Sequence, residues 1–423
     1  MSIGPVSQAR YSDVRLTDRI GIGVLTRIVR RDLVDEVLVE TGRKEIRSRS
    51  LPARVVVYYV MALSLFFGDA YEEVMRRLVG GLQFLGSWRK DWKVPTTSAI
   101  SQARSRLGEA PMRALFERVA TPLASASMSN AWYHSWRLMA IDGVVLDVPD
   151  TPANAAEFGR SANNLAASAY PQVRILGLAE CGTHAMVAAS IGAVSQYERE
   201  LAADLFPALT DNMLVLADRG FYSYDFWKTA RATGADLLWR VKNQIVLPAY
   251  EWLPDGSYRS ALLPKSMRSD MARGKYRRLD RYEIPVRVIE YQITNRDNSE
   301  EVIRLVTSLT DHELCPAAEL AALYHKRWEF ELILDEIETH QTGHPRVLRS
   351  KTPDLVKQEI WGLLLSHYAI RHLMAEAAEH GDTDPDRLSF IRSLRVVRRH
   401  ITEQAAFSPQ PTQDSDQDSD QRD

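Results

Sequence analysis

An uninterrupted apolar segment, MLVLA at residues 213–217, constrains the fold of this chain most. A strand without a polar side is typical of the interior of a sheet that other elements cover on both faces. The neighbouring segments also follow strand and helix patterns: strands at 137–143, 144–148, 170–194 and 236–242, and helices at 196–206 and 223–234. This order of strands, helix, strand, helix and strand predicts a mixed α/β sheet.

An aspartate follows each of two apolar strands. Asp142 ends the run LMAI, and Asp218 comes directly after MLVLA. Asp142 and Gly143 form a pair typical of a turn, so the first strand is expected to end there. Either aspartate could therefore be a turn former. Alternatively, the two could supply carboxylate oxygens for a divalent metal ion.

Segment 324–338 contains neither Gly nor Pro and is predicted to be a helix. At 100° per residue, Tyr324, Arg327, Glu331 and Glu338 fall in a band about 60° wide on one helical face. Arg327 could bind a phosphate with its planar fork or pair with Glu331 one turn on. Tyr324 could contact DNA or pack in the core.

Asp142, Asp218 and Glu331 come from distant parts of the chain, and each lies at the edge of an apolar element. Hard divalent cations select carboxylate oxygens, and one carboxylate commonly bridges two ions. Two such ions, about 3.5–4 Å apart, assist phosphodiester cleavage by stabilising both the attacking and the leaving oxygen. The three acidic residues are therefore predicted to be catalytic and to bind metal.

Changes in composition and hydrophobic pattern divide the chain into segments. The predicted units are an all-α N-terminal domain at 1–130, a sheet domain at 131–242 and 311–400, a β-rich insertion at 243–310, and a disordered acidic tail at 401–423. The last ten residues contain five Asp and no apolar residue.

Two basic regions are candidate DNA contacts. A short helix within 93–108 carries Arg104 and Arg106 and could enter a major groove, or it could be a solvated helix of a bundle. Segment 265–281 has seven Lys and Arg against two Asp, and its candidate phosphate contacts are Lys275, Arg277 and Arg278. The alternative for this segment is an ordinary solvated surface.

Composition excludes several classes of protein. The two cysteines cannot form a disulfide framework, so a reducing cytoplasmic setting is expected. The apolar run at 55–67 has 13 residues, too few to cross a bilayer of roughly 30 Å, and is expected to be a buried helix. The net charge of −2 alone does not favour nucleic-acid binding, but local basic clusters matter more for phosphate contacts than the total.

The chain resembles transposases of the insertion-sequence 4 family, which are DDE transposases with a ribonuclease-H-like catalytic domain. Three motifs carry the resemblance: IDGVVLDVPD at 141–150, LADRGFYSYDF at 216–226, and Y-x2-R-x3-E, which begins the family signature, at 324–331. The resemblance implies that Asp142, Asp218 and Glu331 bind two Mg²⁺ or Mn²⁺ ions.

The resemblance also implies a DNA partner and an assembly. Transposon-end and target DNA would be bound by a homodimer in a synaptic complex, and a bacterial protein of this kind would associate with the nucleoid when bound. Arg219, next to Asp218, is a candidate DNA contact. Some family members flip a base out of the helix and stack it on a tryptophan of the insertion, for which Trp252 is the candidate, although a packing role is the alternative.

One residue departs from the family signature. Its terminal Lys, which contacts a phosphate, is replaced by Glu338, which would repel a phosphate by about 1–4 kcal/mol at 4 Å. Arg346, Arg349 or Lys351 could take over this contact. Otherwise the protein is a degenerate family member that binds DNA but cuts it poorly. A more remote alternative from another class is a glycosidase that uses two of the carboxylates as acid and base.

Overall fold

The computed structural model describes residues 22–45, 51–80, 93–161, 168–264, 267, 283–294, 300–343 and 347–401. Three of the predicted DNA contacts, Lys275, Arg277 and Arg278, lie outside the described residues. The predicted acidic tail lies outside them as well, from residue 402 onward.

The N-terminal region is helical, as predicted. Its helices are η1 (Gly23–Arg27), α2 (Arg31–Glu40), α3 (Ala53–Leu65), α4 (Tyr71–Val79), α5 (Thr97–Leu107) and α6 (Ala110–Val119). Helix α3 is the apolar run, and its side chains are buried from Val55 to Leu65. Within the described part of the chain, no helix is long and apolar enough to cross a membrane.

Arg104 is part of the core of this region. Its side chain is 1% exposed, and its guanidinium donates to Gln358 Oε1 at 2.9 Å, to Tyr71 Oη at 2.9 Å and to Ser350 Oγ at 2.9 Å. A buried guanidinium with its donors satisfied by protein cannot reach a DNA groove. The prediction that Arg104 contacts DNA is therefore wrong, because this side chain ties α5 to α13 (Pro353–His380).

A single mixed sheet spans the rest of the fold, in the order β4-β3-β2-β5-β6-β10-β9-β8-β7. Its strands are β1 (Trp132–Tyr133), β2 (Trp136–Asp147), β3 (Gln172–Glu180), β4 (Ala185–Ala193), β5 (Met213–Ala217), β6 (Asp236–Arg240), β7 (Glu251–Trp252), β8 (Tyr258–Leu262), β9 (Ile284–Thr294) and β10 (Glu300–Thr307). Strands β2, β5 and β6 pair in parallel, and the other pairs are antiparallel. Because β10 pairs with β6, the strands of the insertion extend this sheet.

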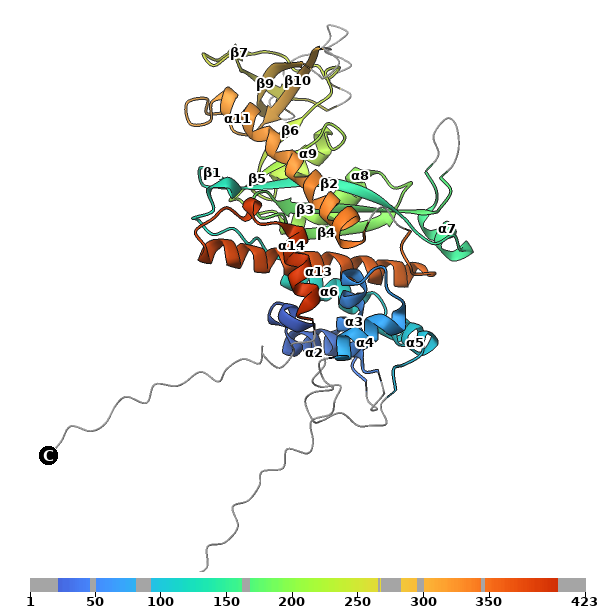
Figure 1. The fold of residues 1–423 in the computed structure, drawn as a ribbon. Helices are drawn as coiled ribbons and strands as arrows, with labels where there is room; N and C mark the ends of the chain where they lie inside the picture. Colours follow the sequence, from blue (N-terminus) through green and yellow to red (C-terminus); the bar gives the residue numbers. More distant parts are fainter. Residues whose placement is uncertain are drawn as a thin grey trace, which may run out of the picture.

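Helix α13 is the layer between the sheet and the N-terminal helices (Figure 1). This helix of 28 residues packs against α3 and α6 on one side and against β4 on the other. Its residues from Glu359 to Arg371 are buried without interruption, which explains why apolar residues occur on all sides of the helix there. The remaining helices are η3 (Ser129–Ala131), α7 (Pro152–Phe158), α8 (Glu198–Ala202), η4 (Ala203–Ala208), α9 (Tyr224–Arg231), η7 (Pro385–Arg387) and α14 (Phe390–Arg399).

The helix predicted at 324–338 is part of a longer helical segment whose hydrogen-bond pattern changes along its length. This longer segment consists of α11 (Ala317–Tyr324), a 3-10 segment η5 (His325–Trp328), α12 (Glu329–Asp335) and a π segment η6 (Glu336–Gln341). A uniform 100° per residue therefore does not hold, and the four residues of the predicted stripe differ in exposure. Short π segments occur frequently at functional sites.

The turn predicted at Asp142 and Gly143 does not form. Strand β2 continues through both residues to Asp147, and Asp142 pairs with Gly177 of β3. A Cβ at Gly143 would lie 2.2 Å from Leu176 Cδ2 and 2.9 Å from the Ile175 carbonyl oxygen. The glycine is therefore required by the close approach of β3, and Asp142 lies within a strand.

Candidate active site

The register of β2 and β5 brings Asp142 and Asp218 side by side. The last parallel pair is Ile141 with Ala217, and each aspartate is the residue that follows its member of this pair. Neighbouring strands lie about 4.8 Å apart, and residues in register on them are close neighbours. Asp218 follows the end of β5, where the polar edge of the sheet begins. Two carboxylates from distant parts of the sequence thus lie close together where β5 ends.

Arg327 lies between the acidic residues. Its Nη1 donates to Asp142 Oδ2 at 2.6 Å and lies 3.9 Å from Glu331 Oε1. Although it is only 7% exposed, its Nε has no hydrogen-bond partner among the described residues. The sequence left open whether Arg327 pairs with Glu331 or binds a phosphate, and the shorter contact in the structure is with Asp142.

Glu331 faces the aspartates from α12, and its side chain is 49% exposed. The charges of Glu331 and Asp218 both act on Asp142, so the three carboxylates share one region. The oxygen atoms of these three residues do not all lie within 4.8 Å of one another. Among the described residues, a group whose ligand atoms do lie this close together is His184, Glu329 and Asp386. The predicted triad therefore has room between its carboxylates, and Arg327 occupies part of it.

The environment of Asp142 suits a cation. Its pKa is raised to about 6, mainly by burial and also by the charges of Glu331 and Asp218. The hydrogen bond from the Gly143 N–H and the charge of Arg327 act in the opposite direction and lower the pKa. A positive ion beside this group would stabilise its charged form. The donors are carboxylate oxygens, which Mg²⁺ and Mn²⁺ prefer. The residues present thus fit a divalent ion of this class.

Tyr324 supports the site from the core. It is buried, and its hydroxyl donates to the Ala217 carbonyl oxygen at 3.3 Å, one residue before Asp218. Burial, together with the nearby charge of Asp218, raises the pKa of this hydroxyl. Of the two readings of Tyr324, the structure supports packing in the core, where it fixes the end of β5.

Tyr324→Phe is expected to reduce the free energy of unfolding by about 1 kcal/mol, because a buried carbonyl loses its donor. Urea unfolding measures this change. Tyr197→Phe, at a residue that is 70% exposed, is the control and is expected to leave stability unchanged. Equal effects of the two substitutions would contradict the assigned role.

Known protein families match most of the chain. Residues 19–117 match the family described as "Insertion element 4 transposase N-terminal". Residues 135–368 match the family described as "Transposase DDE domain". The chain belongs to the insertion element 4 family of DDE transposases.

Individual proteins resemble this transposase too. It is 32% identical over 381 residues to "Transposase InsG for insertion sequence element IS4" of Escherichia coli (strain K12), which covers 89% of this chain and 82% of that protein. "Putative transposase InsZ" of the same organism is 28% identical over 220 residues, covering 52% of this chain and 68% of that protein.

A solved structure, the "Cryo-EM structure of piggyBac transposase synaptic complex with hairpin DNA", aligns with a TM-score of 0.48 and 11% identity, over 91% of this chain and 81% of that one. The predicted ribonuclease-H-like mixed sheet with a helical N-terminal region is confirmed for this transposase. The family membership leaves the glycosidase alternative without support.

Other predicted contacts of the transposase lie on its surface. Trp252 is 68% exposed, and its ring centroid lies 4.9 Å from that of Tyr258, so one face of the ring packs on a neighbour while much of the side chain is open to solvent. Arg219 is also exposed, and its Nη1 lies 3.9 Å from Glu301 Oε1. Arg106 is exposed on α5. These three side chains remain predictions as DNA contacts.

Glu338 lies in the π segment η6, and its pKa is raised by burial and by the charges of Asp335 and Glu331. Arg349 cannot replace the missing Lys, because its guanidinium donates to the carbonyl oxygens of Phe67 at 3.2 Å and Asp69 at 2.6 Å. Arg346 lies outside the described residues, whereas Lys351 is exposed. Lys351 thus remains a candidate for the phosphate contact.

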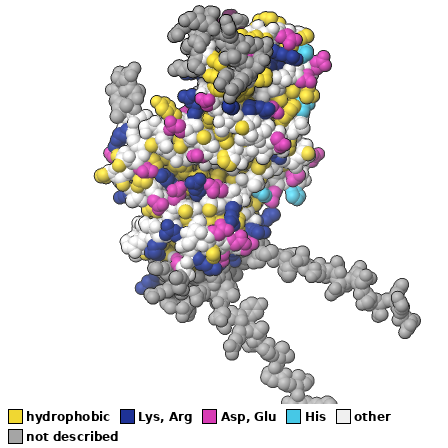
Figure 2. All heavy atoms as spheres, turned by 180° about the vertical axis from the view of Figure 1, so that it is seen from behind, with side chains coloured by type: hydrophobic (Ala, Val, Ile, Leu, Met, Phe, Trp, Pro, Cys, Tyr) yellow, Lys and Arg dark blue, Asp and Glu magenta, His cyan; other side chains and the backbone are white. Residues whose placement is uncertain are grey.

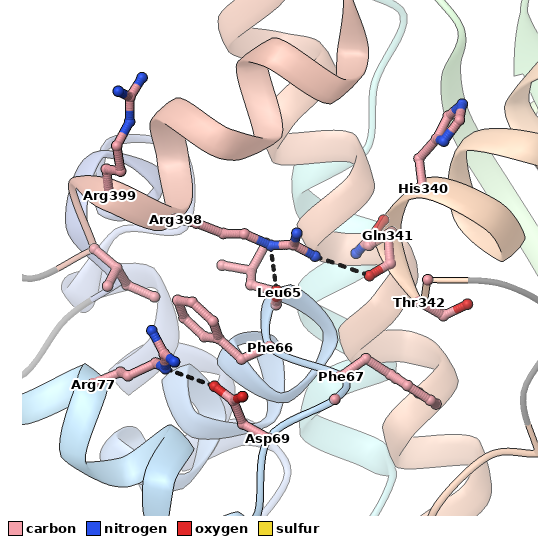
Figure 3. A pocket seen from close by; sticks show the side chains of 13 residues that line it. Leu65, Phe66, Phe67, Asp69, Arg77, His340, Gln341, Thr342, Arg398 and Arg399 are labelled. Atoms are coloured by element: carbon pink, nitrogen blue, oxygen red, sulfur yellow. Dashed lines mark hydrogen bonds and ion pairs between the residues drawn. The ribbon is translucent and has the colours of Figure 1, made fainter.

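A cavity of about 620 Å³ lies away from these carboxylates, where α3, η6 and α14 meet (Figure 3). Its arginines are largely engaged: Arg398 donates to the carbonyl oxygens of Leu65 and Gln341, and Arg77 pairs with Asp69 at 2.6 Å. Arg398 is thus held in place by neutral carbonyl groups, and Arg77 by the charge of Asp69.

Surface charge is mixed on the face opposite to the one seen in Figure 1. In Figure 2, basic and acidic side chains alternate over the described part of that face. An interspersed pattern does not create the broad positive field that draws in DNA. The exposed Arg219 and Trp252 are therefore better guides to a DNA surface than overall charge.

Sequence reasoning missed a buried polar network around Glu336, which follows α12. Glu336 accepts hydrogen bonds from His367 Nε2 at 2.9 Å and Arg371 Nε at 2.8 Å, and His184 lies 3.4 Å from it. The available signal was that α13 carries His367 and Arg371 one turn apart within an apolar run. Buried polar residues need partners, so this spacing indicates an acidic partner elsewhere.

Proposed function

We propose that this transposase binds the terminal inverted repeats of its element and carries out metal-dependent strand cleavage and strand transfer. Asp142, Asp218 and Glu331 would hold two Mg²⁺ or Mn²⁺ ions. The observation that carries the proposal is the parallel register that puts Asp142 beside Asp218, opposite Glu331 on α12. The ions, when bound, would supply charge stabilisation for the attacking and leaving oxygens of the phosphodiester.

The chain's own residues prepare this site. Arg327 fixes the side chain of Asp142 through its 2.6 Å contact and balances the charge of neighbouring carboxylates. Tyr324 fixes the end of β5 and so the start of the Asp218 loop. A site held by rigid strands keeps its oxygens in position without reorganisation during the reaction.

Nicking of a supercoiled plasmid that carries the element's ends tests the proposal. Mg²⁺ is expected to support nicking at the ends, and EDTA is expected to abolish it. Nicking that continues in EDTA, or that does not depend on the ends, would contradict the proposal.

The DNA partner would be held by more than the catalytic site. Pairing two transposon ends requires two active sites, so a homodimer in the synaptic complex is part of the proposal. Arg219, beside Asp218, and Arg106 on α5 would contact the DNA backbone. The expected setting is the bacterial cytoplasm, with nucleoid association while DNA is bound.

Trp252 is proposed to stack on a base near the cut. Trp252→Ala is expected to weaken binding of end DNA by roughly 5- to 150-fold, because stacking contributes about 1–3 kcal/mol per base. A gel shift measures the change, and Trp252→Phe, which keeps a ring, should retain most of the affinity. Because Trp252 is exposed, stability should not change. Unchanged binding by Trp252→Ala would rule out the stacking role.

Glu338 bears on the alternative of a degenerate transposase. Glu338→Lys is expected to tighten end binding by about fivefold or more, because a repulsion of about 1–4 kcal/mol toward phosphate is removed. Glu338→Gln separates loss of the negative charge from gain of a positive one. Absence of nicking by the natural protein, with nicking restored by Glu338→Lys, would favour the degenerate alternative.

A further inference from the structure

His184, Glu329 and Asp386 form a second cluster of metal-ligating side chains, separate from the proposed catalytic carboxylates. One potential ligand atom from each residue lies within 4.8 Å of the others. His184 belongs to the turn between β3 and β4, Glu329 is the first residue of α12, and Asp386 belongs to η7. Three elements that are far apart in sequence therefore meet at this cluster.

His184 points an unused nitrogen into the cluster. Its side chain is buried, with the residue only 4% exposed, and its Nε2 has no hydrogen-bond partner among the described residues. The Asp386 Oδ1 atom lies 3.5 Å from this nitrogen. Leaving a buried ring nitrogen unpartnered costs about 1–3 kcal/mol, so a ligand at this position would be stabilising.

The other ring nitrogen of His184 faces a carboxylate and a guanidinium. Its Nδ1 lies 3.4 Å from Glu336 Oε1 and closer to Arg371 Nη2, which can only donate, so Nδ1 accepts from Arg371 and the ring proton lies on Nε2. A cation on Nε2 would move this proton to Nδ1, which would then donate to Glu336. Glu336 thus provides the outer carboxylate that commonly orients metal-binding histidines.

Glu329 is already oriented toward the cluster. Its Oε2 accepts from the Gly182 N–H at 2.5 Å, and its Oε1 lies 2.6 Å from Lys326 Nζ. Each carboxylate oxygen has a second lone pair that a cation can use. Since Lys326 pairs with Glu329 and Arg371 pairs with Glu336, the negative charge of Asp386 remains without a Lys or Arg partner in this cluster and would attract a cation.

We propose that His184 Nε2 and carboxylate oxygens of Glu329 and Asp386 bind a structural divalent cation of the Zn²⁺ class. One imidazole and two carboxylates match the ligands of Zn²⁺ better than the all-oxygen sets of Mg²⁺. Asp386 is exposed, which gives the ion an entry path to two buried ligands. The ion would fasten the start of α12, two residues before Glu331, to the β3–β4 turn and to η7.

Zinc binding to the full chain tests the site. The affinity for Zn²⁺ is measured by competition with a chromophoric chelator, with Mg²⁺ in excess, and thermal unfolding is followed with and without Zn²⁺. The test variants are His184→Asn and Asp386→Asn; Asn suits the φ of +58° at His184 better than other residues do. Asp382→Asn, an exposed acid four residues from Asp386, and Glu331→Gln at the catalytic site are the controls.

The natural chain is expected to bind one Zn²⁺ and to show a saturable rise in Tm. The control variants Asp382→Asn and Glu331→Gln should show the same binding and the same rise. His184→Asn and Asp386→Asn should each weaken binding by at least about 100-fold, the upper end of what loss of an outer partner produces. If His184→Asn does not fold, the isosteric Asp386→Asn decides. No Zn²⁺ binding by the natural chain, or binding lost in Glu331→Gln instead, would overturn the site and leave an internal salt-bridge network.

Discussion

Asp142→Asn is expected to reduce strand cleavage by about 10³-fold or more while end DNA is still bound. An amide is a poor ligand for a hard cation, and a bound cation contributes several kcal/mol to transition-state stabilisation. Because each 1.36 kcal/mol is a factor of ten in rate, about 4 kcal/mol corresponds to this loss. Asp142 is the strongest test of the three carboxylates, because it contacts Arg327 directly and its side chain is less exposed than that of Glu331.

Nicking assays measure the cleavage rate, and gel shifts measure end binding. Asp218→Asn and Glu331→Gln should behave as Asp142→Asn does. The control is Asp211→Asn, an exposed aspartate before β5, at the end of that strand opposite Asp218, and it should cleave normally. Loss of DNA binding in all three catalytic variants would mean that these residues hold the fold instead.

Glu336→Gln is expected to produce the largest loss of stability, about 3–5 kcal/mol. Glu336 is buried and accepts from His367 and Arg371, so an amide in its place would leave the Arg371 guanidinium buried without its counter-charge. The midpoint of urea unfolding measures the loss. Glu331→Gln, five residues earlier on a half-exposed side chain, is the matched control and should change stability by less than about 1 kcal/mol.

The same group predicts a pH dependence. Burial alone would raise the pKa of Glu336, but hydrogen bonds from His184 and His367 and the charge of Arg371 hold it well below its usual value of 4.5. A depressed pKa contributes stability that is fully present above the unfolded value and is lost as the pH falls below it. The natural protein should therefore lose stability below about pH 4.5 more steeply than Glu336→Gln does.

Local sequence patterns predicted the elements better than their exact limits. The apolar run MLVLA is a buried strand, and the mostly apolar segments at 55–65 and 359–371 belong to buried helices. The turn predicted from the pair Asp142 and Gly143 was wrong. This pair is typical of turns, but here the glycine makes room for Leu176 of a neighbouring strand. A close approach between strands is not visible in local sequence.

The proposed catalytic residues could be selected from sequence, but their arrangement could not. Which strands pair, and in which register, depends on contacts between residues about 76 positions apart, such as Ile141 with Ala217. The role of Arg104 was missed for the same reason, since its partners Gln358 and Ser350 lie in a distant segment. The network of His184, Glu336 and Arg371 likewise joins three elements that carry no shared local signal.

Crystals of the transposase grown with Mn²⁺ and end DNA test the central claim most directly, through anomalous scattering at the manganese edge. The account predicts two manganese ions about 3.5–4 Å apart, each bound by oxygens from Asp142, Asp218 or Glu331. Manganese bound only elsewhere, with those three carboxylates bonded to protein groups alone, would contradict it.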